Sequence, residues 1–142
     1  MYRSISVFAM ASSFLLAGCI ADESEPLGEG ASKARLQEGE WKVVSLGGQN
    51  VVAGSPATLL FSEDSQVSGN ASCNRLVASY TVQGSEISTT PGGTTMMMCP
   101  PELMEQEQKM MGLLQAVDTY RIDESGALVL GRESGKQIIA RR

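Results

Sequence analysis

Few side chains in this 142-residue sequence could carry out acid–base, nucleophilic or metal chemistry. The chain contains no histidine, which excludes Ser-His-Asp and Cys-His catalysis and the usual imidazole ligands of zinc and haem. It has no glycine-rich phosphate loop and no EF-hand spacing, and the acidic pairs Glu63-Asp64 and Asp123-Glu124 adjoin turn residues, where carboxylates are usually solvated. We therefore expect no enzymatic activity, no catalytic residue, no metal site and no cofactor.

The first cysteine, Cys19, has the sequence context of a lipidation site. Arg3 is followed by an uncharged apolar segment, 5–17, which is shorter than the roughly 20 residues of a membrane-spanning helix and typical of a secretory signal. The segment ends in Leu16-Ala17-Gly18-Cys19, which resembles a lipobox: small residues admit the signal peptidase, and the thiol accepts a diacylglycerol group. We expect residues 1–18 to be removed and Cys19 to become an acylated N-terminus, carrying chains such as palmitate, that binds the membrane.

The residues after Cys19 bear on localisation. Ile20, rather than aspartate, follows the cysteine, and by resemblance to Gram-negative lipoproteins this favours the outer membrane, facing the periplasm. Residues 20–39 are rich in Glu, Asp, Ser, Gly and Pro without an apolar period, so we expect 19–39 to be a lipidated cysteine and a flexible acidic tether. The net charge of −5 and the lack of any Lys or Arg run argue against nucleic-acid binding.

Residues 40–142 are expected to form one folded domain. Apolar or alternating segments between turn residues predict strands at 41–46, 57–61, 76–82, 86–89, 94–98, 119–122, 127–130 and 137–140. Residues 101–117 predict a helix, because Pro101 suits a first helical position and an apolar stripe, broken by Glu107, recurs at helical spacing. We predict an α+β fold in which a small, antiparallel, barrel-like curved sheet of about eight strands is covered by one α-helix.

Two motifs in this domain are similar to those of a known family. The segment Ser68-Gly69-Asn70-Ala71-Ser72-Cys73-Asn74-Arg75 resembles the Gly…Cys-Asn-Arg signature of the META domain, an HslJ-like family of bacterial lipoproteins. Thr95-Met96-Met97-Met98-Cys99 resembles the family's Thr-x-Met-x-Cys element, whereas Leu76 stands where the family often has an aromatic residue. The resemblance implies a small barrel-like α+β fold, similar to that of secretin pilot lipoproteins, and an association with envelope stress and drug tolerance.

With Cys19 lipidated, Cys73 and Cys99 remain. In an oxidising compartment a disulfide between them is the favoured hypothesis. It would close a loop of about 26 residues and stabilise the fold by about 3 kcal/mol in the chain-entropy model. Two buried free thiols are the alternative, and a redox-active pair is disfavoured because the sequence has no Cys-x-x-Cys.

Asn74 and Arg75 are the candidate interaction surface of the domain. The favoured interpretation of the two residues is nevertheless structural: Asn74 shapes the turn, and Arg75 pairs with an acid at the rim of the barrel. The methionines raise a second question, since six of the eight lie between Met96 and Met111. Thioethers can bind copper(I), but methionine packing between a helix and a curved sheet is the favoured interpretation.

We predict a lipid-anchored, monomeric envelope protein that does not bind nucleic acid. One alternative function is a carrier of a small apolar ligand or lipid inside the half-barrel. That alternative requires an internal cavity, with a lining of Leu59, Phe61, Met104, Met111 and Leu114. Another is a pilot-like escort that binds a second envelope protein through an exposed apolar patch beside the helix.

Overall fold

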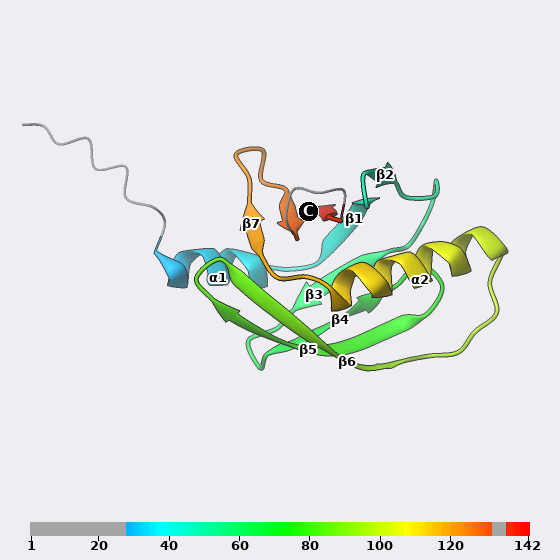
Figure 1. Ribbon diagram of the computed structural model, residues 1–142, viewed down its shortest axis with the longest axis horizontal. Coiled ribbons are helices and arrows are strands. Elements are labelled where there is room, and N and C mark those ends of the chain that lie inside the picture. The colour runs from blue at the N-terminus through cyan, green and yellow to red at the C-terminus, as the bar shows by residue number, and fades with distance from the viewer. Residues whose placement is uncertain (1–27, 132–135) are drawn as a thin grey trace, which may run out of the picture.

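One curled antiparallel sheet contains all the strands of residues 28–131 and 136–142, which the computed structural model describes (Figure 1). In chain order the elements are α1 (Glu29–Gln37), β1 (Trp41–Leu46), β2 (Gln49–Asn50), β3 (Thr58–Phe61), β4 (Gln66–Asn70), β5 (Arg75–Gln83), β6 (Glu86–Thr94), α2 (Pro101–Gln115), β7 (Tyr120–Ile122), β8 (Leu128–Leu130) and β9 (Ile138–Arg141). Their order in the sheet is β6-β5-β4-β3-β1-β9-β8-β7, with β2 paired to β1. This confirms the predicted α+β fold with a barrel-like sheet. The expected signal segment and Cys19 lie outside the described residues.

The two edges of the sheet meet at one end and are separated by a helix at the other. Glu86 of β6 forms a bridge with Thr119, and the Tyr120 N–H donates to the Ser85 carbonyl at 2.9 Å. Further along β6, the Thr89 hydroxyl donates to the carbonyl of Leu114 at 2.6 Å. Helix α2 packs against β6 on one side and against β1 and β9 on the other, so it covers the open side of the half-barrel (Figure 1).

The core follows the alternation of the strands. In β5 the inward residues Leu76, Ala78 and Tyr80 are buried, while the residues between them are exposed. The ring of Phe61 packs edge-on against Tyr80, with ring centroids 5.2 Å apart. Leu114 of α2 completes this core from the helix side. The interior of the half-barrel is therefore occupied by side chains of the sheet and of α2.

Helix α1 corrects the expectation of a flexible tether over 19–39, because residues 29–37 are helical. The helix is docked by Leu36, which is fully buried and whose carbonyl accepts the indole N–H of Trp41 at 2.8 Å. The Gln37 amide adds a hydrogen bond of 2.6 Å to the hydroxyl of Tyr80. The folded unit thus begins before Glu40. The helix was not predicted because Leu36 is its single apolar anchor, and one apolar residue gives almost no amphipathic pattern.

The last residue of the chain holds α1 from the other side. The Arg142 guanidinium lies over the Trp41 ring, 4.0 Å from its centroid, in cation–π geometry. It also pairs with Glu38 at 2.9 Å and donates to the carbonyl of Arg35. The two ends of the folded unit therefore lie against each other at Trp41.

Three strands of the structure differ from those predicted: β2 and β4 were not predicted, and β6 is longer than expected. The strand expected at 94–98 is wrong, because β6 continues from Glu86 to Thr94 and the chain then leaves the sheet. Pro91 is tolerated within β6 because β6 is an edge strand. The strand β4, Gln66–Asn70, was not predicted, since Val67 is its one strongly apolar residue.

Gly69 of β4 lies where a side chain cannot fit. A Cβ at this position would come within 2.1 Å of the Thr58 carbonyl oxygen in the neighbouring strand, whereas at Gly93 of β6 it would meet nothing within 4 Å. We expect Gly69→Ala to lower the free energy of unfolding by about 1–3 kcal/mol, because paired backbone has to move. Urea denaturation measures the change, and Gly93→Ala is the matched control. Equal stability of the two variants would contradict this packing.

The turn between β7 and β8 predicts a pH dependence. Hydrogen bonds from the Ser125 hydroxyl and the Ala127 N–H, with the charge of Arg141, lower the pKa of Asp123. A carboxyl group whose pKa is lower in the folded protein than in the unfolded chain stabilises the fold at pH values above its unfolded-state pKa. This stabilisation is lost as the pH falls through its folded-state pKa. Asp123→Asn keeps an acceptor but cannot ionise. Its stability deficit in urea should be full near neutral pH and shrink below about pH 4; a deficit independent of pH would refute the assignment.

Candidate functional site: the clamped methionine loop

The turn that joins β4 to β5 is buried and needs partners for its backbone. Ala71, Ser72, Cys73 and Asn74 are all less than one tenth exposed. Ser72 has a φ of 107°, a left-handed value that is costly for a residue with a side chain. The Ala71 N–H bonds to the Asn74 carbonyl at 2.7 Å within the turn. The Ser72 N–H donates to the side chain of Asn70 at 2.8 Å, whereas the N–H groups of Cys73 and Asn74 face α2.

Glu107 of α2 supplies acceptors to this turn. Its Oε2 accepts the N–H of Asn74 at 2.6 Å and the N–H of Cys73 at 3.3 Å, and its Oε1 accepts the Asn74 side-chain amide at 3.0 Å. Hydrogen bonds to a carboxylate are stronger than neutral ones. In the sequence, Glu107 stands out only as an interruption of the apolar stripe. A charged residue at this helical position, half-buried in the structure, is the signal for an acceptor that faces the sheet.

Gln106, the preceding residue of α2, joins the helix to a second loop. Its Nε2 donates to the hydroxyls of Ser72 at 2.7 Å and Ser55 at 2.6 Å, while its Oε1 accepts the Val52 N–H at 2.6 Å. Neighbouring helix residues therefore hold two separate loops of the sheet. We call Ser72, Cys73, Asn74, Gln106 and Glu107 the clamp.

Asn74 links the clamp to residues 95–100, which we call the methionine loop. Its Oδ1 accepts the Met97 N–H at 2.6 Å and the Thr95 hydroxyl at 3.0 Å. The disulfide between Cys73 and Cys99, with Cα atoms 5.8 Å apart, fixes the loop a second time. Asn74 is only 5% exposed, so it acts as a positioning residue and not as a surface for partners. Of the predicted pair, Arg75 alone is exposed, on the outer face of the sheet.

The methionine loop displays its side chains to solvent. Met96, Met97 and Met98 are 96%, 56% and 90% exposed, whereas Met110 of α2 is fully buried. The packing interpretation is therefore correct for Met110 and wrong for the three methionines of the loop. These three also make up most of the large apolar side chains exposed in the described part of the chain, the others being Leu60 and Val77. Such a concentration of exposed apolar side chains typically marks a binding surface.

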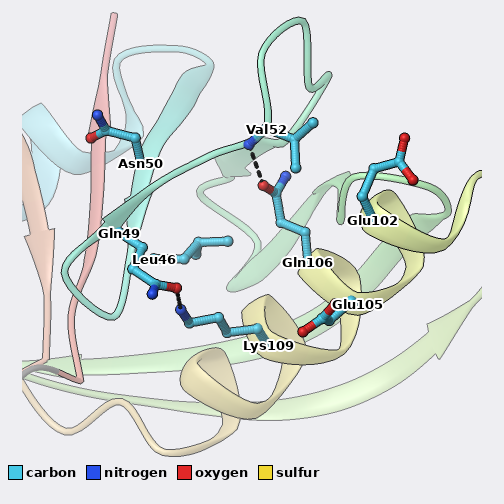
Figure 2. Close-up of a pocket in the computed structure, with 8 residues that line it drawn as sticks. All are labelled: Leu46, Gln49, Asn50, Val52, Glu102, Glu105, Gln106 and Lys109. Atoms are coloured by element: carbon cyan, nitrogen blue, oxygen red, sulfur yellow. Dashed lines mark hydrogen bonds between the residues drawn. The ribbon is translucent and has the colours of Figure 1, made fainter.

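A small pocket lies on the opposite side of α2 from the sheet edge β6, between the helix and the β1–β2 hairpin (Figure 2). Its volume is about 190 Å³, below the roughly 300 Å³ of typical ligand sites. Its polar groups are partly paired, since Lys109 donates to Gln49 at 2.7 Å and Val52 to Gln106 at 2.6 Å (Figure 2). The pocket is therefore a weaker candidate than the methionine loop.

The five side chains that were expected to line an internal ligand cavity do not line this pocket. Leu59, Phe61 and Leu114 are packed in the core, and Met104 and Met111 are half-buried on α2. Within 28–131 and 136–142, no group of three His, Cys, Asp or Glu side chains is arranged to hold a metal ion. No helix in these same ranges has the length and apolar character needed to cross a membrane.

Comparison with known proteins adds a family and a fold. Residues 34–142 match the family model of the META domain. One solved NMR structure is 23% identical over 76% of this chain and 92% of its own, with a TM-score of 0.55. Another, of a protein from Burkholderia xenovorans, is 19% identical over 94% of this chain and 96% of its own, with a TM-score of 0.58. No curated protein matches significantly. At these identities the structural likeness shows the fold alone.

The clamp predicts a specific cost for changing Glu107. In Glu107→Gln, an amide replaces one carboxylate oxygen and brings a donor against the N–H groups of Cys73 and Asn74. We expect a loss of about 1–3 kcal/mol in the free energy of unfolding and faster hydrogen exchange at these two amides. Glu105→Gln, at an exposed position of the same helix, is the control. If both variants unfold alike and the amides stay protected, the carboxylate does not hold the turn.

Proposed function

The chain belongs to the META domain family, and we propose that it is a non-enzymatic, lipid-anchored protein of the bacterial outer membrane that presents the methionine loop as a binding surface. The observation that carries the binding role is the exposure of Met96 and Met98 on a loop whose backbone is held by Asn74 and a disulfide. An apolar surface on a fixed backbone loses little conformational entropy when a ligand binds. The resemblance to the META family supports a role in envelope stress or drug tolerance as part of this proposal.

The position of the loop supports an anchored arrangement. Residues 20–27 alone separate Cys19 from Gly28, so the chain between them spans at most about 30 Å when fully extended. Helix α1, which follows directly, and the start of α2, which follows the methionine loop, lie at opposite ends of the long axis of the molecule (Figure 1). A lipid on Cys19 would hold the α1 end near the membrane and leave the methionine loop facing away from it.

The use of the buried polar groups supports a role without catalysis. Both oxygens of Glu107, the amide of Asn74 and the amide of Gln106 bond to groups of the protein itself. A general acid or base needs a proton or lone pair that reaches a substrate. The strongest polar cluster of the domain is instead committed to holding loops in place.

Of the two alternative functions, the escort is supported by an observation, whereas the carrier is not. An escort of another envelope protein needs an exposed apolar patch, and Met96, Met97 and Met98 form one beside the start of α2. A carrier needs room inside the half-barrel, where Phe61 and Leu114 are packed against their neighbours. We therefore propose the escort as the second candidate function.

The anchor is tested by expressing the full chain with its own signal segment in a Gram-negative host. Intact-mass spectrometry of the membrane fraction should find a mature chain that starts at Cys19 and carries the added mass of acyl groups. Cys19→Ala, the matched variant, should lose the acyl mass and leave the membrane fraction on alkaline carbonate extraction, because one residue supplies the thioether. An unmodified N-terminus at another position, or membrane retention of the variant, would overturn the lipid anchor.

A further inference from the structure

We propose that the methionine loop is a thioether site for copper(I), with Met96 and Met98 as ligands and Met97 completing the set. This inference rests on the binding role proposed above and names the class of its ligand. Within the described residues no three His, Cys, Asp or Glu side chains are arranged to hold a metal ion, and Cys73 and Cys99 are joined to each other. The exposed metal-binding groups that the loop itself concentrates are the thioethers of Met96, Met97 and Met98, neutral sulfur donors that suit soft ions such as copper(I).

The loop is tied down at every second residue. The Thr95 hydroxyl bonds to Asn74, the Met97 N–H bonds to the same side chain, and Cys99 is held by the disulfide. The residues between these attachment points, Met96 and Met98, are the two most exposed side chains of the loop. The attachments therefore hold the backbone on either side of each exposed thioether.

The spacing suits one ion. Alternate residues of an extended chain lie about 6.6 Å apart, and each methionine has three rotatable bonds beyond Cα. Two sulfur atoms can thus converge on a single ion without movement of the backbone. Met97 is 56% exposed, so its sulfur is also within reach of solvent and can serve as a third donor.

The backbone contacts explain why the loop does not bury its methionines. A mobile loop with three adjacent methionines would fold them onto the nearby apolar surface, since burial of each side chain is favourable by about 1.5–3 kcal/mol. The bonds from Asn74 to Met97 at 2.6 and 3.5 Å prevent that movement. The same contacts reduce the entropy lost on binding. The thioethers remain available at the surface of a fixed scaffold.

The test uses the full lipoprotein in detergent, with its disulfide intact and its methionine methyl groups labelled with carbon-13. Silver(I), a soft monovalent ion that is stable to redox change, is the first probe. We expect the methyl resonances of Met96 and Met98 to shift and saturate near one equivalent, while those of Met104 and Met110 stay in place. Unchanged Met96 and Met98 resonances would overturn the proposal.

Affinity for copper(I) is then measured by competition with a chromophoric chelator under ascorbate. Met96→Leu/Met98→Leu keeps the apolar surface and removes both sulfurs, and we expect it to weaken binding by at least about tenfold, a loss that even indirect partners of metal ligands can cause. Met104→Leu/Met111→Leu is the matched control and should bind as the wild type does. Wild-type affinity in the first variant would overturn the site.

The pH profile gives an independent readout. Thioethers do not titrate, so affinity should be the same between pH 5 and 8, whereas ligands that must lose a proton give a pH-dependent affinity. A steep pH dependence would assign the metal to other groups. If the protein carries its acyl mass but binds no copper(I) or silver(I), the metal proposal fails and the anchor stands. A leucine variant that loses the metal and keeps a protein partner would show that the loop also has an apolar docking role.

Discussion

The hydrogen bonds between Glu107 and the turn at Cys73 and Asn74 are the interaction on which the clamp and the loop beyond it depend. The turn is buried, and its N–H groups have left the strand ladder, so they require acceptors from another element. A carboxylate on α2 meets that requirement and thereby sets the rotation and height of the helix over the sheet. The position of α2 and the conformation of the turn are consequently coupled, because a change in either would leave buried polar groups unpaired.

Asn74 connects the Glu107 contact to the methionine loop. Its amide nitrogen donates to Glu107, and its amide oxygen accepts the N–H of Met97 and the hydroxyl of Thr95. The Cys73–Cys99 disulfide repeats the link covalently. The backbone of the methionine loop is thus fixed at several points, and Met96, Met97 and Met98 are exposed to water.

Patterns with strong local causes could be predicted from the sequence. The alternation of β1 and β5 placed these strands within one residue of their observed ends, and Pro101 marked the first residue of α2. Helix α1 escaped prediction because its docking depends on one apolar residue, Leu36, and on contacts with Tyr80 and Arg142, which are distant in the chain. Cooperation among such distant groups leaves little trace in local periodicity.

For the candidate site, too, some features could be predicted from the sequence and others could not. The two cysteines could be paired in advance from their number and the expected compartment, and the motif residue Asn74 was recognised. Its burial was not, because a polar side chain on a turn is usually solvated. The exposure of Met96 and Met98 was also missed, since hydropathy favours burial and only the contacts of Asn74 and Glu107 explain the opposite outcome.

The pairing of β1 with β9 has a consequence for the order in which the molecule can be made. These strands are neighbours at the centre of the sheet although they lie at opposite ends of the domain sequence, and the final residue, Arg142, packs on Trp41. A chain made in the N-to-C direction can pair β1 with β2 and β3 early, but it lacks β9, the other neighbour of β1, until residues 138–141 are available. The two halves of the sheet therefore cannot join until nearly all of the domain sequence is present.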